Sequence, residues 1–292
     1  MDRHVVIDIG GLSYNKLFSL GSKKEVESTG LQKETLLALE SEKRFTTWRY
    51  DMTMEVIQFL DYWKPNYLTL ACDGSKLWRK EIYPEYKTNR NAARDALPID
   101  WDLWKTVRNE LVAELEEYLP IRTMHLPKIE ADDICYVLVE KLHEEQEIIA
   151  YADDKDWYYN FKFPNYRQFK IRDRSEVKGV DPVESLQMKL LTGDAGDNIK
   201  NLRPRLGEVT ARKIITECSG NIYGWALKEG LLDNFELNQR LINLDRIPKD
   251  IKDDIWNAYQ SKKVVAVDHM KLMDHFTDTY DLITALNLQK LR

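Results

Sequence analysis

Three short apolar segments, each closed by an acidic residue, constrain the fold of this chain more than any other feature. They cover residues 4–7, 67–72 and 147–151. Asp8 and Asp73 follow the first two segments, and a cluster of aspartates over 153–156 follows the third. Such runs predict buried strands, and the helical spacing of apolar residues between them predicts crossover helices. We therefore expect an α/β fold in which a mostly parallel central sheet, flanked by helices, carries these acids at the carboxyl ends of its strands.

The rest of the pattern predicts how the chain is divided. Helices are expected over residues 12–20, 52–63 and 100–119 and from Glu130 onward, with a short strand over 121–126. Gly10 and Gly11 predict a turn after the first strand, and the alternating aromatic and basic residues of 157–174 predict short strands or a hairpin. Asp181-Pro182 predicts a helix start, because proline favours the first helical position. We expect an α/β catalytic domain over residues 1–180 and a helical domain over 181–292.

The composition limits the class of protein. The 292 residues, 43% of them hydrophobic, suit one large domain or two smaller ones. No apolar stretch is long enough to span a bilayer, and the N-terminus runs straight into a predicted strand, so we expect no membrane segment and no signal peptide. Three cysteines without metal-site spacing favour a reduced, cytoplasmic protein. The net charge of -6 argues weakly against nucleic acid, although clustered cation-binding acids would lower the total in this way.

The strongest candidate site is a set of nine carboxylates that come from five segments, each at a strand end, a helix start or a glycine-containing loop. They are Asp8, Asp73, Glu130, Asp132, Asp133, Asp154, Asp156, Asp194 and Asp197. Three of them precede the apolar run 134–139, where like charges repel one another unless a cation neutralises them. A solvated acidic helix start is the alternative there. The whole set suits two hard divalent cations, Mg²⁺ with Mn²⁺ as a substitute, which about 4 Å apart can clamp both reacting oxygens of a phosphodiester.

Other chemistries fit the sequence less well. There is no Cys/His cluster for zinc, no Ser/His/Asp set and no phosphate-binding P-loop. A PIN-type ribonuclease would share the acid-lined sheet but would not need residues 181–292. A non-catalytic branched-DNA-binding module could lose its acids, and a phosphatase with Asp8 as nucleophile would need a second acid where Gly10 stands.

A basic and aromatic segment over residues 75–94 is a candidate nucleic-acid surface. Its candidate contact residues are Arg79, Tyr86, Lys87, Arg90 and Arg94. Cations interleaved with aromatic rings suit a surface that follows a phosphate backbone and stacks on bases. A solvated charged loop is the alternative. A second group of cations surrounds the predicted helix start near Gly207 and comprises Arg203, Arg205, Arg212 and Lys213.

Five motifs in this order resemble the 5′-nuclease family, which includes flap endonucleases, the 5′-3′ exonuclease domain of bacterial DNA polymerase I and phage RNase H-type nucleases. They are Ala71-Cys72-Asp73, Tyr83-Pro84-Glu85-Tyr86-Lys87-Thr88-Asn89-Arg90, Glu130-Ala131-Asp132-Asp133, Asp154-Lys155-Asp156-Trp157 and Gly193-Asp194-Ala195-Gly196-Asp197-Asn198-Ile199. The resemblance covers roughly residues 4–250 and implies a PIN-like sheet. It departs from the family pattern at three positions, where Lys155, Arg205 and Val209 stand.

The resemblance also implies roles. The five acids before residue 140 would surround a first metal ion, and the four after it a second. Lys87 and Arg90 would lie at the base of an arch near residues 76–105 and act with Asp73 and Glu130 in catalysis, while Tyr86 stacks on a base. The segment around Gly207 would be a helix-turn-helix element that grips duplex phosphates, often with a potassium ion.

The implied function is a Mg²⁺-dependent 5′-3′ exonuclease or flap endonuclease, including RNase H-type primer removal. The implied substrates are branched or nicked DNA and RNA·DNA duplexes with 5′ ends. We expect a monomer, with replication proteins such as a clamp or a single-strand-binding protein as partners.

Overall fold

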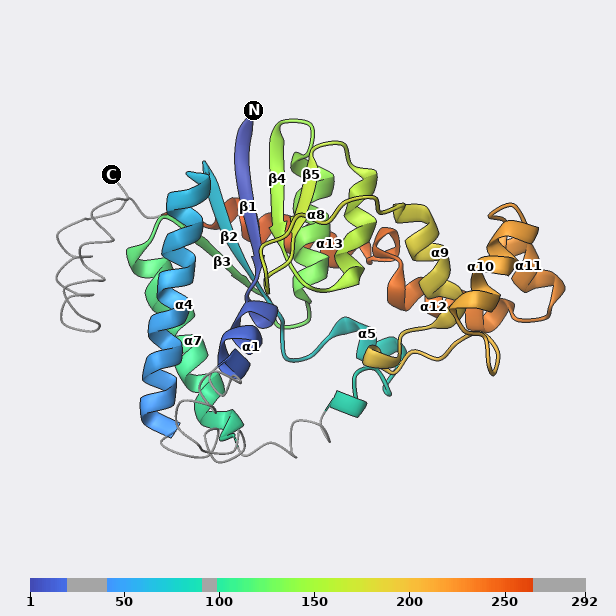
Figure 1. The fold of residues 1–292 in the computed structure, drawn as a ribbon, viewed down its shortest axis with the longest axis horizontal. Coiled ribbons are helices and arrows are strands. Elements are labelled where there is room, and N and C mark those ends of the chain that lie inside the picture. Colours follow the sequence, from blue (N-terminus) through green and yellow to red (C-terminus); the bar gives the residue numbers. More distant parts are fainter. Residues whose placement is uncertain (20–40, 91–98, 265–292) are drawn as a thin grey trace.

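A parallel five-stranded sheet forms the centre of the molecule, as the apolar segments predict (Figure 1). The computed structural model describes residues 1–19, 41–90 and 99–264. The strands are β1 (Asp2–Asp8), β2 (Tyr67–Cys72), β3 (Arg122–His125), β4 (Gln146–Tyr151) and β5 (Tyr166–Phe169), in the order β3-β2-β1-β4-β5. All four neighbouring pairs are parallel, so the carboxyl ends of the strands lie along one edge.

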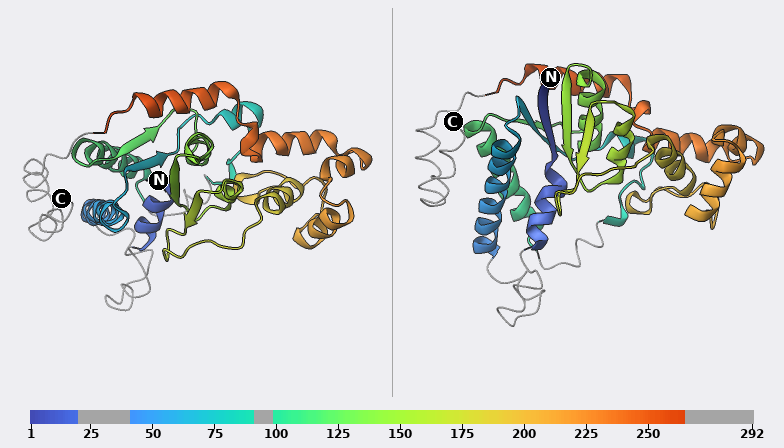
Figure 2. Two further views of the ribbon diagram at one scale, coloured as in Figure 1. Left: turned by 90° about the horizontal axis from the view of Figure 1, so that it is seen from above. Right: turned by 45° about the horizontal axis from the view of Figure 1, so that its top comes forward.

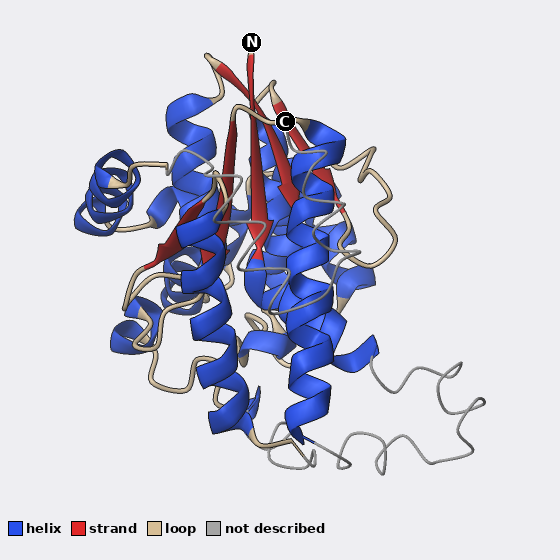
Figure 3. Cartoon of the chain, turned by 90° about the vertical axis from the view of Figure 1, so that its left-hand side faces the viewer, coloured by secondary structure: helices blue, strands red, loops and turns tan. Residues whose placement is uncertain are grey.

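Helices cover both faces of the sheet, which explains why the strands are apolar throughout instead of alternating. One face packs against α1 (Ile9–Ser19), α4 (Ser41–Trp63) and α7 (Trp101–Tyr118). The other packs against α8 (Ala131–Leu142) and α13 (Lys249–Ser261), and Figures 2 and 3 show the strands between these two layers. In β1 the side chains of Val5 and Ile7 enter the first core and that of Val6 enters the second.

A group of short helices projects from one end of the sheet (Figure 1). It contains α9 (Pro182–Thr192), α10 (Glu208–Glu217), α11 (Ile222–Lys228) and α12 (Leu232–Ile242), which enclose a core of their own. The short 3₁₀ helices η2 (Ala195–Asp197) and η3 (Leu244–Arg246) lie in the connections. Helix α13 then returns to the sheet and packs on α8. A domain boundary near residue 180 stays a prediction.

Two local predictions need correction. The segment after β4 forms the 3₁₀ helix η1 (Lys155–Lys162) and then β5, which is one of the predicted short strands, but β5 is parallel to β4, so the hairpin alternative is wrong. Its aromatic residues alternate because Trp157 and Tyr166 enter the core beside α8, whereas Phe169 enters the core on the other face. Gly10 and Gly11 form no separate turn either, because α1 begins at Ile9.

Among the residues that the structure describes, no helix combines the length and the apolar character that crossing a membrane requires.

Candidate active site

The carboxyl edge of the sheet borders a cavity of about 300 Å³. Its acidic lining residues are Asp8, Asp73, Asp132, Asp153, Asp154 and Asp156. They come from the ends of β1 and β2, the first turn of α8 and the segment that follows β4. Parallel register brings these ends together, because Asp8 pairs with Ala71 and Ile7 pairs with Tyr151. We call this space, as the candidate site of catalysis, the catalytic cavity.

Asp8 lies at the end of β1 and caps α1. Its Oδ1 accepts a hydrogen bond of 2.9 Å from the Gly11 amide. A Cβ on Gly11 would lie 2.6 Å from Asp8 Oδ2 and 3.0 Å from Ile171 Cδ1, so glycine is required here for space. Burial, together with the charges of Asp73 and Asp154, raises the pKa of Asp8 to about 7. The charges that act most strongly on Asp8 are thus those of other acids, which a bound cation would neutralise.

Asp73 and Asp132 face the same cavity from the next elements. Asp73 Oδ1 accepts a 2.9 Å hydrogen bond from the Ala131 amide, which ties the end of β2 to the start of α8. Burial raises the pKa of Asp132 well above its usual value, and the charge of Asp133 adds to this effect against the opposing charge of Arg79. Closely spaced carboxylates with raised pKa values are the donor set that a hard divalent cation requires.

Arg79 is buried beneath this cluster. Its guanidinium donates to Glu130 Oε2 at 2.6 Å and to both carboxylate oxygens of Asp133, at 2.7 and 3.0 Å. Burial alone would raise the pKa of Glu130, but Arg79 and Lys87 hold it at about 2. The Trp78 indole also donates to Asp133, at 2.8 Å. Glu130 and Asp133 thus brace the start of α8 and do not line the catalytic cavity.

Arg79 and Tyr86, which the sequence predicts as nucleic-acid contacts, are each only 2% exposed in this structure, so neither is presented at the surface. Ion pairs with the buried acids Glu130 and Asp133 hold the Arg79 guanidinium inside the protein. Tyr86 donates to Asp197 Oδ2 at 2.9 Å and to Glu130 at 3.2 Å instead of presenting its ring for base stacking. Arg94 lies outside the described residues.

Lys87 and Arg90 do line the catalytic cavity. Lys87 contacts Glu130 and lies 3.6 Å from Asp197 Oδ2, and Arg90 contacts Asp197. Burial would lower the pKa of the Lys87 amine, but Glu130 and Asp197 raise it, so the side chain carries a positive charge. The turn that bears these cations is fastened to the loop around η2, where the Lys87 amide donates to the Asp197 carbonyl at 2.9 Å.

A second acid cluster lies beside the cavity. Single carboxylate oxygens of Asp156, Asp194 and Asp197 lie within 4.8 Å of one another, close enough to share one ion. Asp194 caps η2 by accepting from the Gly196 amide at 2.8 Å. Lys189, on α9, contacts both Asp156 and Asp194.

The predicted duplex-binding residues gather near the start of α10, which packs against α9. Arg203 pairs with Glu229 at 3.0 Å, Lys213 lies 3.6 Å from Glu217, and Arg212 contacts Glu184. Gly207 caps α10. Arg205 is exposed and has a φ of +63°, the left-handed conformation that glycine favours, which fits its place at a family glycine position.

Two residues of the site escaped prediction. Asp153 lines the catalytic cavity, and its place in the aspartate cluster after β4 was a usable signal. Lys189 had no signal, because a lysine in an amphipathic helix normally points to solvent.

A family model described as the N-terminal resolvase-like domain of 5′-3′ exonucleases matches residues 5–181. The chain belongs to the 5′-3′ exonuclease family. It is 31% identical over 216 residues to the ribonuclease H of Enterobacteria phage T4, covering 68% of this chain and 70% of that protein. It is 28% identical over 174 residues to the 5′-3′ exonuclease of Bacillus subtilis, covering 56% of each chain.

Solved structures show the same family fold. A flap endonuclease of bacteriophage T5, in a pseudo-enzyme–product complex with DNA and metal ions, matches with a TM-score of 0.64 at 17% identity, over 89% of this chain and all of that one. The catalytic core of Rad2 with a DNA substrate matches with a TM-score of 0.53 at 16% identity, over 99% of this chain and 91% of that one.

Proposed function

We propose that this member of the 5′-3′ exonuclease family is a Mg²⁺-dependent 5′ nuclease that hydrolyses phosphodiesters near the 5′ ends of branched, nicked or RNA·DNA duplexes. One observation carries the proposal: six carboxylates and two cations from five separate segments face a single cavity at the edge of the sheet. The names of the phage T4 and Bacillus subtilis relatives support the same class of reaction.

The acids are assigned to two cation sites. Asp8, Asp73 and Asp132 would hold one ion, with Glu130 and Asp133 positioning the helix that carries Asp132. Asp154, Asp156, Asp194 and Asp197 would hold a second, and Mn²⁺ would substitute for Mg²⁺. When bound, the two ions supply the positive charge that stabilises both the attacking and the leaving oxygen of a phosphodiester.

Lys87 and Arg90 are assigned to the scissile phosphate. Both side chains end in the catalytic cavity, and each is held there by an acid. Phosphate oxygens are negatively charged, as carboxylate oxygens are. A phosphate that enters the cavity therefore replaces a carboxylate as the partner of each side chain. They stabilise the charge that develops on the phosphoryl oxygens.

The duplex is assigned to the helix-turn-helix element of α9 and α10, about which Arg203, Arg205, Arg212 and Lys213 are grouped. Such contacts go to phosphates and read no sequence. The potassium ion at this element, the clamp and single-strand-binding partners, the monomeric state and the cytoplasmic location stay predictions.

The test is product sizing on 5′-labelled flap, nicked and RNA·DNA substrates in Mg²⁺, with EDTA as the control. The proposal expects short products released from the 5′ strand and dependent on a duplex junction. Cleavage of unpaired RNA without any preference for a junction would favour a PIN-type ribonuclease, and binding without cleavage would favour a non-catalytic module.

A further inference from the structure

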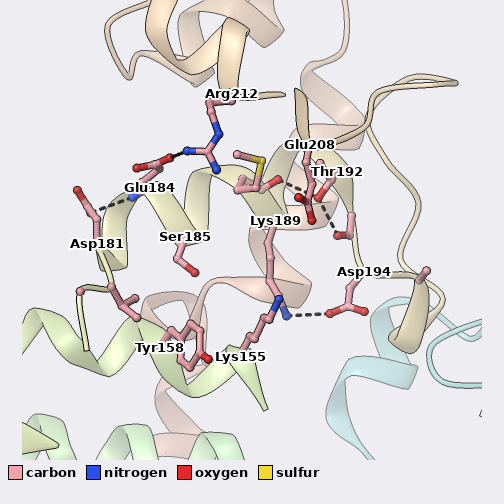
Figure 4. Close-up of a pocket in the computed structure, with 15 residues that line it drawn as sticks. Lys155, Tyr158, Asp181, Glu184, Ser185, Lys189, Thr192, Asp194, Glu208 and Arg212 are labelled. Atoms are coloured by element: carbon pink, nitrogen blue, oxygen red, sulfur yellow. Dashed lines mark hydrogen bonds and ion pairs between the residues drawn. The ribbon is translucent and has the colours of Figure 1, made fainter. Parts of the chain in front are cut away.

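Lys189 lines one cavity and contacts an acid that lines another. It lines a second cavity of about 540 Å³ between η1, α9 and α10, whose wall also includes Lys155, Tyr158 and Arg212 (Figure 4). Its amine donates to Asp194 Oδ2 at 2.8 Å and also contacts Asp156 Oδ1. Asp156 lines the catalytic cavity, so the lysine reaches from one space to the edge of the other.

The Lys189 amine contacts two of the three carboxylates that a shared cation would need. Asp156 and Asp194 each give one oxygen to Lys189, and the same two residues belong to the carboxylate group that is compact enough for a single ion. Repulsion prevents an ammonium and a divalent cation from sharing the same two carboxylates at contact distance. Occupation of the cluster by metal therefore requires the amine to leave.

Arg79, the cation that pairs with Glu130 and Asp133, is fixed in place, in contrast to Lys189. Arg79 is 2% exposed, lies 4.5 Å from the ring centroid of Trp78 and donates to the Leu241 carbonyl at 2.9 Å. The Lys189 side chain is 20% exposed and sits at the rim of a cavity large enough to receive it. Arg79 is thus a permanent brace, whereas Lys189 has both the freedom and the space to move.

We propose that Lys189 is the resident counter-ion of the Asp156–Asp194–Asp197 cluster, that it competes with the divalent cation for this cluster, and that it withdraws into the adjacent cavity when the cation binds. This inference rests on the proposed function, because it presumes that the cluster receives the second ion. Competition with Lys189 makes the second site bind its cation more weakly than the number of its carboxylates alone would predict. The lysine then acts as a positioning residue that preserves the geometry of the cluster between metal-binding events.

The test is a titration with Mn²⁺, followed by isothermal calorimetry and by the electron paramagnetic resonance signal of free Mn²⁺, without nucleic acid. Lys189→Met removes the charge and keeps most of the side-chain volume. We expect the weaker of two Mn²⁺ sites to bind about five- to tenfold more tightly in this variant, as expected for loss of one competing, partly exposed ion pair. Lys189→Arg, which keeps the charge, should bind Mn²⁺ as weakly as the wild type.

Lys155→Met is the matched control. It removes one positive charge from the wall of the same cavity, between Asp154 and Asp156 in the chain. Within the described part of the chain Lys155 forms no ion pair with Asp156, Asp194 or Asp197, so the Mn²⁺ affinity of this variant should change less than twofold. Lys189→Gln is the second variant if Lys189→Met does not fold. Equal gains in Mn²⁺ affinity in Lys155→Met and Lys189→Met would show an effect of net charge alone and overturn the proposal. An unchanged or lower Mn²⁺ affinity of the second site in Lys189→Met would also overturn it.

Failure of this inference is distinguishable from failure of the proposed function. If the wild type binds two Mn²⁺ ions and cleaves substrate while Lys189→Met leaves the weaker affinity unchanged, only the counter-ion role is overturned. If the wild type binds no Mn²⁺ and cleaves nothing in Mn²⁺ or Mg²⁺, the proposed function fails and this inference fails with it.

Discussion

At the scale of single residues, the role that we propose for Lys87 and Arg90 is in the chemical step more than in substrate affinity. Both line the catalytic cavity and both contact acids there. We expect Lys87→Ala and Arg90→Ala each to slow the single-turnover rate about 10²-fold, since a cation on developing phosphoryl charge is worth several kcal/mol. Lys80→Ala, at an exposed position on α5 (Trp78–Ile82), is the control and should leave the rate unchanged. A loss confined to affinity would make Lys87 and Arg90 steering residues.

Asp8 predicts how the stability of the metal-free protein depends on pH. Its pKa is about 7 in the folded state and about 4 in the unfolded chain. Between these values the folded state holds a proton that the unfolded state releases, so the Asp8 contribution to stability rises as pH falls from about 8 to about 3. The contribution is at most about 4 kcal/mol, because each pKa unit is worth about 1.4 kcal/mol.

The measurement compares urea unfolding of the wild type and Asp8→Asn in EDTA at several pH values. The comparison with Asp8→Asn is needed because His4 also makes stability depend on pH. Burial lowers the pKa of His4 to about 3, so the free energy of unfolding decreases as pH falls below 6.5, where the unfolded chain takes up a proton and the folded state does not. The pKa of Glu130 is about 2 in the folded state, and its contribution is lost only below its ordinary value of 4.5. Asp8→Asn should lose the acid-dependent gain, and an identical pH profile in both proteins would show that Asp8 carries its charge at neutral pH.

At the scale of elements, Arg79 joins α5, the start of α8 and α12. We expect Arg79→Ala to reduce the free energy of unfolding by about 3–5 kcal/mol, because it leaves Asp133 buried without its cation and Glu130 with Lys87 alone. Urea denaturation in EDTA measures this loss. Lys105→Ala, which removes an exposed pair with Asp102, should cost no more than about 0.5 kcal/mol. A similarly small loss at Arg79 would contradict its assignment as a brace.

The elements themselves were largely predictable, and their charged contacts were not. The apolar runs 67–72 and 147–151 predict β2 and β4, because burial on both faces leaves a continuous apolar pattern. Burial of Arg79 depends on partners 51, 54 and 162 residues away along the chain, and no local pattern encodes such separations. Lys189 was hidden for a related reason: its partner Asp156 is 33 residues away, and its partner Asp194 lies beyond the end of α9, where helical spacing no longer predicts a contact.

At the scale of the whole molecule, the proposed duplex-binding element of α9 and α10 lies at the end opposite α7 (Figure 1). Arg203 and Arg212 already contact Glu229 and Glu184, whereas Arg205 is exposed. Replacing Arg205 and Lys213 together with alanine should flatten the slope of log K against log salt by about 2, close to one unit for each lost phosphate contact. Lys105→Ala with Arg108→Ala on α7 is the control and should leave the slope as it is. An unchanged slope in the variant that lacks Arg205 and Lys213 would show that the duplex binds elsewhere on the protein.

The central claim is that the acids at the sheet edge hold the metal while separate basic surfaces hold the nucleic acid. The most direct measurement compares cleavage of a 5′ flap in Mg²⁺ with flap binding in Ca²⁺ for the wild type, Asp73→Asn and Asp154→Asn. We predict that each substitution lowers the single-turnover rate by at least about 10³-fold, which is about 4 kcal/mol of lost stabilisation of the transition state, while the dissociation constant for the flap stays within about threefold. Substitutions that weaken binding as much as they slow cleavage, or that leave the rate intact, would contradict the account.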